Sequence, residues 1–223
     1  MPPHTITAIE RQKKNPKRVS IYVDDEFAIG VHIETLAHYG LRKGDSLEEK
    51  KLKELERAEE LQSAKEKSMR LLGYRARSEK EIRDRLGKKS FNVAVIDETI
   101  VALKRSRLLD DAAFARTFTH DAIARKPLGK HLLRRELRQK GIANEIIESV
   151  IGEVYDEESE EEFALKLTRK YMNKKTGSKK KSTGVQGRMK EKKRLADYLA
   201  RRGFDWETVS TVLSKVLPEA RKE

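Results

Sequence analysis

The cations of this sequence are the residues whose type and spacing point most clearly to a chemical role. The 223 residues include 50 lysines and arginines against 37 aspartates and glutamates, a formal net charge of +13. Such an excess favours polyanionic partners, with nucleic acid first, acidic protein surfaces second and membrane surfaces third. The chemistry expected is ion pairing with phosphate groups, which releases counterions and does not depend on base sequence.

The excess charge lies in two stretches of the chain. Residues 62–109 carry 13 basic and 6 acidic residues, and residues 157–223 carry 18 and 11, so each stretch has a net charge of +7. The densest run, residues 173–194, holds ten lysines or arginines and one glutamate. Its Gly, Ser and Thr content predicts a flexible loop. No aromatic residue interleaves these lysines, so we expect phosphate contact there without base stacking.

Residues suited to catalysis or metal binding are sparse. The absence of cysteine excludes disulfides, thiolate metal sites and cysteine nucleophiles. The five histidines show no H-E-x-x-H arrangement, and no G-x-S-x-G element occurs. The stretch Gly177–Gly184 does not fit a phosphate-binding loop. We therefore expect no catalytic residues, no cofactor and no metal, and hence a protein that is not an enzyme.

Asp110 and Asp111 admit two interpretations. The pair could bind a metal ion or transfer protons, or one carboxylate could cap a helix beginning at Ala112 by accepting a bond from a first-turn N–H. No third ligand or histidine stands at helical spacing from the pair. We therefore favour the cap.

The elements that must position these side chains repeat along the chain. Phe91, Ile142 and Phe204 each have a leucine five residues earlier, an aliphatic residue four before that, and aliphatic residues at +5, +9 and +12. This spacing places each apolar set on one helical face. A further helix precedes each set, so the unit is helix–turn–helix–turn–helix, present three times. One unit buries little by itself, and we expect a mainly α-helical protein of stacked repeats.

The N-terminal segment has a different pattern. Apolar residues alternate over 19–23 and again over 27–31, with a turn at 24–26 between them, which predicts a β-hairpin. Ile6 and Ala8 suggest a preceding strand that would turn at Asn15-Pro16. A short helix is expected over 34–39, and a long, charged, solvated helix follows from Ser46 to about Leu72.

Two motifs within the repeats resemble those of the RecX family of RecA regulators. Residues 109–115 (LDDAAFA) are similar to its D-D-x-x-F-A signature. Residues 126–129 (KPLG) with 133–142 (LRRELRQKGI) are similar to its P-x-G…E-L-x-x-K-G-[IV] element, and residues 78–86 resemble the same element in the first repeat. Two departures stand out. Ser90 replaces the usual turn glycine, and Leu108 or Leu109 stands where a tyrosine often precedes the paired aspartates.

The resemblance implies a non-enzymatic, cytoplasmic modulator with a mainly α fold. Three tandem three-helix repeats would form an elongated, curved strip that lodges in the groove of the RecA–single-stranded DNA filament. There it would modulate, chiefly inhibit, the recombinase, ATPase and co-protease activities of RecA. We expect a monomer whose partners are the RecA filament, single-stranded DNA and, more weakly, duplex DNA. The expected parts are a strand-rich extension (1–45), a charged connecting helix (46–61) and repeats over 62–109, 110–156 and 157–217, the last with a basic insert at 173–194.

The candidate contacts with RecA or DNA are the cations of the second helix of each repeat and of the basic insert. Their recurrence in three units favours a basic row along the strip, against the alternative of an ordinary solvated face. For the insert, the alternative is a solubilising segment. The candidates are Arg83, Arg85, Lys88, Lys130, Arg134, Arg135, Arg138, Lys140, Lys174, Lys175, Lys179, Lys180, Lys181, Arg188, Lys192, Lys193, Arg194, Arg201 and Arg202.

Two further expectations complete the sequence-based prediction. Trp206, at the start of the last helix, is expected to be a packing residue. The alternative function is a stand-alone DNA- or RNA-binding protein, either sequence-independent or of helix-turn-helix type, which the charge and the three-helix units would suit. Against it, no helix carries a distinctive base-reading set of Asn, Gln and Arg at one N-terminus.

Overall fold

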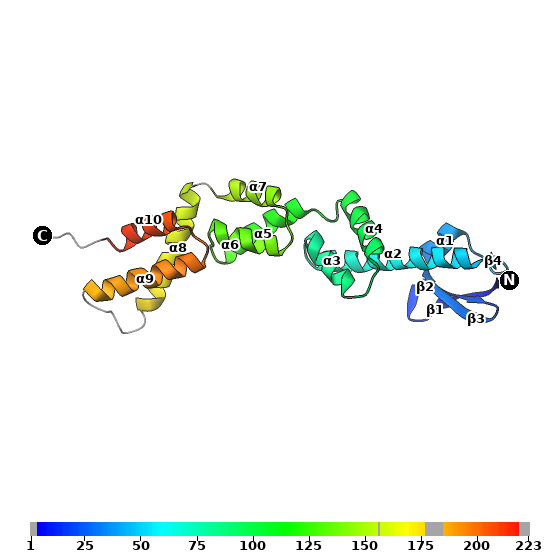
Figure 1. Ribbon diagram of the computed structural model, residues 1–223. Helices are drawn as coiled ribbons and strands as arrows, with labels where there is room; N and C mark the ends of the chain where they lie inside the picture. Colours follow the sequence, from blue (N-terminus) through cyan, green and yellow to red (C-terminus); the bar gives the residue numbers. More distant parts are fainter. Residues whose placement is uncertain (1–3, 156, 177–184, 219–223) are drawn as a thin grey trace. The chain divides into compact units, whose positions relative to one another are not determined.

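The computed structural model describes residues 4–155, 157–176 and 185–218. The chain divides into two compact units, residues 1–109 and 110–223. A small sheet and helices α1–α4 form the first unit, and helices α5–α10 form the second (Figure 1). Gly177–Gly184 lies outside the described residues.

The first unit begins with a four-stranded antiparallel sheet. Strands β1 (His4–Gln12), β2 (Asn15–Val23), β3 (Glu26–His32) and β4 (Ser46–Leu47) pair in the order β3-β2-β1-β4. The predicted hairpin is β2–β3. Its turn residues Asp24 and Asp25 have φ angles of 49° and 68°, as the tight turn that matches strand twist requires.

The turn between β1 and β2 differs from the sequence-based prediction. Gln12 pairs with Asn15, so Lys13 and Lys14 form the turn, and the prediction of a turn at Asn15-Pro16 is wrong. The register of the strands places Ile6, Ile21 and Val31 in the core of the sheet.

Helix α1 (Ile33–Tyr39) follows the sheet and ends at Gly40, whose φ of 60° forms a left-handed cap. Helix α2 (Glu49–Tyr74) then runs for 26 residues without a break. Leu55 of α2 belongs to the core beneath the sheet, whereas Ala64 of the same helix belongs to the core of the first repeat. The predicted connecting helix and the first helix of repeat 1 are therefore one element.

Buried polar contacts join α2 to the sheet. The carboxylate of Glu59 accepts a hydrogen bond from the backbone N–H of His32 at 2.6 Å and forms an ion pair with Arg18. Arg18 also donates to the carbonyl of Gly30 at 2.8 Å, and the Nε2 atom of His32 lies 3.1 Å from the carboxylate of Glu66. Two buried atoms of this junction, Nε2 of His32 and Oε1 of Glu59, make no hydrogen bond, so the ion pairs with Glu66 and Arg18 are what offset their burial.

The predicted three-helix repeats are confirmed. Repeat 1 adds α3 (Glu79–Gly87) and α4 (Val93–Arg105) to the second half of α2. Repeat 2 consists of α5 (Asp111–Arg125), α6 (Lys130–Gln139) and α7 (Asn144–Val154). Repeat 3 consists of α8 (Glu157–Thr176), α9 (Val185–Arg201) and α10 (Trp206–Val216).

Each repeat has its own apolar core, and the aligned positions of the sequence form it. Fifteen of the eighteen aligned residues are buried, and Phe91, Val154 and Val216 are half-buried against the same clusters. In each repeat the leucine of the second helix, namely Leu86, Leu137 or Leu199, is fully buried. The apolar spacing therefore identified the core.

The turn between the second and third helices has the same backbone form in all three repeats. Gly141 and Gly203 occupy its last position with φ angles of 80° and 84°, and Ser90 adopts the same left-handed conformation with φ of 60°. In each turn this residue's N–H bonds to the carbonyl three residues earlier, at 2.9 Å. The missing glycine in repeat 1 therefore leaves the turn geometry unchanged.

The basic run is more helical than expected. Helix α8 extends to Thr176 and α9 begins at Val185, so the run is helical on both sides of 177–184. The prediction of a flexible loop over the whole of 173–194 is therefore wrong at both ends.

A candidate interface for polyanionic partners

Some predicted contact residues already have partners within the fold. Arg134 on α6 forms two hydrogen bonds to the carboxylate of Glu148 on α7, both of 2.8 Å. These bonds lower the pKa of Glu148. Arg83 on α3 forms the equivalent ion pair with Asp97 on α4 and a second one with Glu79. Arg83 and Arg134 occupy equivalent positions, and in repeats 1 and 2 an arginine at this position forms an ion pair that links the second helix to the third.

Three more candidates take part in packing within the second unit. The Nζ atom of Lys130 lies 3.0 Å from the carboxylate of Glu160, whose exposed fraction is 2%. The guanidinium of Arg202 donates to the backbone carbonyls of Lys126 (2.9 Å) and Pro127 (2.7 Å). The ammonium of Lys140 lies 5.8 Å from the centre of the Phe118 ring. These side chains contribute to the structure whether or not they also meet a partner.

The remaining described candidates are mostly exposed, and they lie on or directly after the second helix of each repeat. Arg138 is exposed and donates to the Asn144 side chain at 3.1 Å, and Lys192 is half-buried. Lys174 and Lys175 belong to the last turn of α8, and their side chains lie outside the description, as do Lys179, Lys180 and Lys181 altogether. The other exposed candidates are Arg85, Lys88, Arg135, Arg188, Lys193, Arg194 and Arg201.

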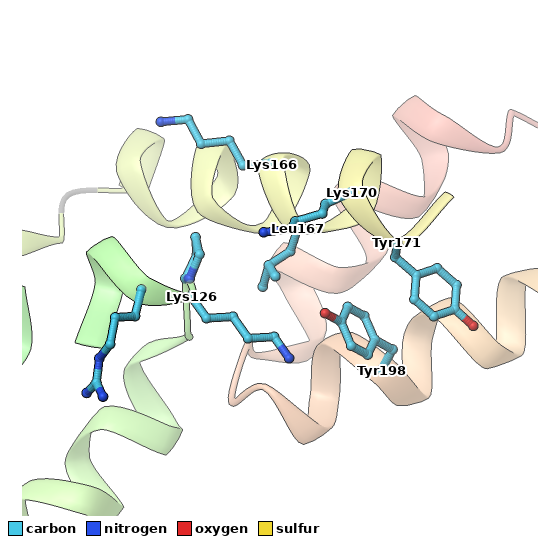
Figure 2. Close-up of a pocket in the computed structure, with 8 residues that line it drawn as sticks. Lys126, Lys166, Leu167, Lys170, Tyr171 and Tyr198 are labelled. Atoms are coloured by element: carbon cyan, nitrogen blue, oxygen red, sulfur yellow. The ribbon is translucent and has the colours of Figure 1, made fainter. Parts of the chain in front are cut away.

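Sequence reasoning missed a basic and aromatic pocket in the second unit. The pocket has a volume of about 420 Å³ and lies among the turn between α5 and α6, helix α8 and helix α9 (Figure 2). Its cations and rings come from three segments that are far apart in the sequence, so no local motif contains them. The lining residues are Arg125, Lys126, Pro127, Lys166, Leu167, Lys170, Tyr171 and Tyr198.

Close backbone packing positions one wall of this pocket. The N–H of Gly129 donates to the carbonyl of Arg202 at 2.8 Å, and the N–H of His131 donates to the carbonyl of Gly203 at 3.1 Å. A Cβ atom on Gly129 would lie 2.2 Å from the Gly203 carbonyl oxygen, which leaves room only for glycine. The α5–α6 turn that carries Lys126 is thereby fixed against the α9–α10 turn.

Asp110 and Trp206 lie at the starts of helices α5 and α10. The carboxylate of Asp110 accepts hydrogen bonds from the N–H groups of Ala112 (2.8 Å) and Ala113 (3.0 Å), so the predicted helix cap is confirmed, and α5 begins one residue earlier than expected. Trp206 is 74% exposed, so its prediction as a packing residue is wrong. It is the first residue of α10, where its side chain points away from the core.

The described part of the chain contains neither a metal-binding cluster nor a membrane-spanning helix. Within residues 4–155, 157–176 and 185–218, no group of three or more His, Cys, Asp and Glu side chains could hold a metal ion. In the same residues, no helix combines the length and apolar character needed to cross a membrane.

The fold and its basic surfaces define a helical repeat protein with a small N-terminal sheet. Models of RecX domains match this chain in order: the RecX N-terminal domain at residues 4–48 and the first, second and third RecX three-helix domains at 64–103, 110–151 and 160–213. The chain therefore belongs to the RecX family of regulatory proteins.

Individual relatives agree with this assignment. The Regulatory protein RecX of Listeria monocytogenes serotype 4a (strain HCC23) is 34% identical over 214 residues, covering 96% of this chain and 76% of the relative. That of Staphylococcus aureus (strain Newman) is 30% identical over 211 residues, covering 95% and 74%.

Two solved structures share the fold. A crystal structure of regulatory protein RecX matches with a TM-score of 0.73 at 24% identity, over 94% of this chain and 98% of that one. The crystal structure of RecX from Lactobacillus salivarius matches with a TM-score of 0.61 at 19% identity, over 71% and 97%.

Proposed function

We propose that this protein binds the RecA–single-stranded DNA filament in the cytoplasm and restrains the recombinase, ATPase and co-protease activities of RecA. It acts as a monomer and without catalysis of its own. The observation that carries the proposal is the match of all four RecX domains, in order, across residues 4–213. The proposal includes contact with single-stranded DNA and a weaker contact with duplex DNA.

The exposed cations of the second helices are the groups that would meet the filament. They recur on α3, α6 and α9, and their charge suits both DNA phosphates and acidic protein surfaces. The mechanism is steric and electrostatic, because a repeat protein that bridges neighbouring RecA protomers would alter their assembly and disassembly.

The test is the single-stranded-DNA-dependent ATPase of RecA, measured on circular single-stranded DNA with increasing amounts of this protein. The expected result is a falling rate and co-sedimentation of the protein with the filament. An unchanged ATPase rate without co-sedimentation would overturn the proposal. DNA binding that persists in that case would support the stand-alone DNA-binding function instead.

A matched pair of variants on α6 tests the assigned surface. Arg135 is exposed, whereas the neighbouring Arg134 is held by Glu148, and both substitutions to glutamine remove one positive charge. Arg135→Gln is expected to raise the concentration needed for half-maximal ATPase inhibition about 3-fold or more, the loss of roughly one charge-assisted contact. Arg134→Gln should leave that concentration nearly unchanged. A larger effect at Arg134 would contradict the assignment of the exposed face.

A further inference from the structure

We infer that the pocket among the α5–α6 turn, α8 and α9 binds one nucleotide of single-stranded DNA, with the base on the ring of Tyr198 and the flanking phosphates on Lys126 and Lys170. This site adds to the proposed function a direct DNA contact that needs no RecA. It also supplies the aromatic component that the basic run of the sequence lacks.

The composition of the pocket fits a nucleotide. Four of its eight lining residues are cations and none is acidic, so the cavity attracts phosphate. The half-buried rings of Tyr171 and Tyr198 give it aromatic surface for a base, whereas Leu167, with an exposed fraction of 1%, offers almost no accessible surface. A volume of about 420 Å³ lies within the range of small-ligand sites.

The two tyrosine rings are stacked, and a base can stack on them as a third ring. The rings of Tyr171 and Tyr198 are stacked, with centroids 4.8 Å apart and planes inclined by 26°. The ammonium of Lys126 lies 5.7 Å from the centre of the Tyr198 ring. Figure 2 shows Tyr171 and Lys126 on opposite sides of that ring. One face of Tyr198 is thus covered by an aromatic ring, and the other faces the cavity and a cation.

A base can take the place that the Lys126 ammonium occupies. Stacking of a base on an aromatic ring is stronger than a cation–π contact at an exposed site, so the exchange is favourable. The displaced ammonium stays within reach of the phosphate attached to the bound nucleoside, because the Lys126 side chain is long and exposed. The contact with Tyr198 and the contact with phosphate therefore support each other.

The phosphate contacts fall to Lys126 and Lys170. Both side chains are exposed at the pocket. The ammonium of Lys166 lies 5.7 Å from the centre of the Phe163 ring, and Figure 2 shows it pointing away from Tyr198. Arg125 donates to the carbonyl of Asp121 at 3.3 Å.

The site discriminates against other polyanions. The bases of a duplex are stacked in pairs and cannot enter a pocket of this size, whereas the bases of a single strand are free to do so. An acidic peptide would pair with the lysines but would gain nothing from the tyrosine ring. Binding that depends on Tyr198 is therefore the signature of a single-stranded nucleic acid.

The experiment measures fluorescence anisotropy of a labelled twenty-nucleotide oligo(dT) with the full-length protein and no RecA. Tyr198→Ala is expected to weaken binding about 5- to 150-fold, the range for loss of one base–aromatic stack, while Tyr198→Phe keeps near-normal affinity. Lys126→Gln and Lys170→Gln should each reduce the slope of log K against log salt by about 0.7. Lys50→Gln, an exposed lysine of α2 that does not line the pocket, is the charge-matched control and should leave both the affinity and the slope near normal.

A labelled duplex of twenty base pairs separates a stacking contact from a general loss of charge or structure. Tyr198→Ala should leave duplex affinity nearly unchanged. Equal weakening for oligo(dT) and duplex, or unchanged oligo(dT) affinity in a folded Tyr198→Ala protein, would overturn the inference. If that variant fails to fold, unchanged salt slopes in both lysine variants overturn it. Because RecA is absent, these outcomes are independent of the ATPase test.

Discussion

Ser90 shows how a single residue can be held in a conformation that its type disfavours. Its φ of 60° places it in the left-handed region, which costs a residue with a Cβ atom about 1–2 kcal/mol. On one side the fully buried Leu86 and on the other the half-buried Phe91 pack into the core of repeat 1, and this packing fixes the turn and imposes the conformation. The equivalent residues of the other repeats are glycines, which adopt it at no steric cost.

Ser90→Gly should therefore stabilise the protein. The relief of strain exceeds the extra freedom that glycine gives the unfolded chain, so the expected gain in unfolding free energy is about 0.5–1 kcal/mol. Urea denaturation followed by circular dichroism measures it. The reciprocal variant, Gly203→Ala, is expected to lower stability, because its Cβ atom would lie 2.3 Å from the backbone nitrogen of Leu132. A lower denaturation midpoint for Ser90→Gly would show that Ser90 is not strained.

At the scale of elements, the junction of the α5–α6 and α9–α10 turns depends on backbone contacts. Arg202 spans the carbonyls of Lys126 and Pro127, and two glycines allow the main chains to meet. The planar guanidinium reaches both carbonyls with two nitrogen atoms held in a rigid fork, whereas a lysine offers a single nitrogen on a flexible stem. Arg202 was a sequence-based candidate for partner contact, and its side chain also holds repeats 2 and 3 together.

Arg202→Lys is expected to lower the unfolding free energy of the second unit by about 1–2 kcal/mol, although the charge is conserved, because a single ammonium nitrogen cannot reproduce the three guanidinium hydrogen bonds to the two carbonyls. Arg201→Lys is the matched control. Its side chain is exposed, and the change should stay within about 0.5 kcal/mol of zero. Thermal unfolding of both variants under the same conditions gives the comparison. Equal stability of the two would mean that the Arg202 contacts contribute nothing measurable.

The elements themselves were largely predictable, because their signals are local. Apolar spacing identified the repeat cores, alternation identified β2 and β3, and Asp110 identified the start of α5. The first turn of the sheet was misplaced because Asn and Pro favour turns, yet the pairing of Gln12 with Asn15 places them in a strand. The exposure of Trp206 was missed because composition says nothing about which side of α10 faces the core.

The candidate site was predictable only in part. The basic second helices follow from the repeat alignment, but sequence cannot tell that Arg134 is paired with Glu148 while Arg135 is exposed. The pocket was not predictable, because Lys126, Lys170 and Tyr198 meet only after repeats 2 and 3 have packed. Contacts between residues far apart in the sequence determine both the pairing of Arg134 and the formation of the pocket.

For the whole molecule, the division into two compact units predicts that a core substitution in one unit destabilises that unit and leaves the other unchanged. Leu133 is fully buried in the core of repeat 2, and Leu133→Ala should cost about 2–5 kcal/mol. Hydrogen exchange followed by mass spectrometry is expected to accelerate in peptides of residues 110–218 and to stay unchanged in residues 4–109. Leu55→Ala, in the core beneath the sheet, should give the opposite pattern. Accelerated exchange in both units of either variant would contradict independent cores.

The unbroken α2 has a mechanical consequence. Its 26 residues extend for about 39 Å, and the sheet core and the core of repeat 1 are both built on it. Glu60 of α2 also accepts a hydrogen bond from the backbone N–H of Asn92, at 2.8 Å, just before α4. A force applied to the sheet would therefore rotate or translate α2 as one rigid helix. Because α2 contains no hinge, α4 would move with it.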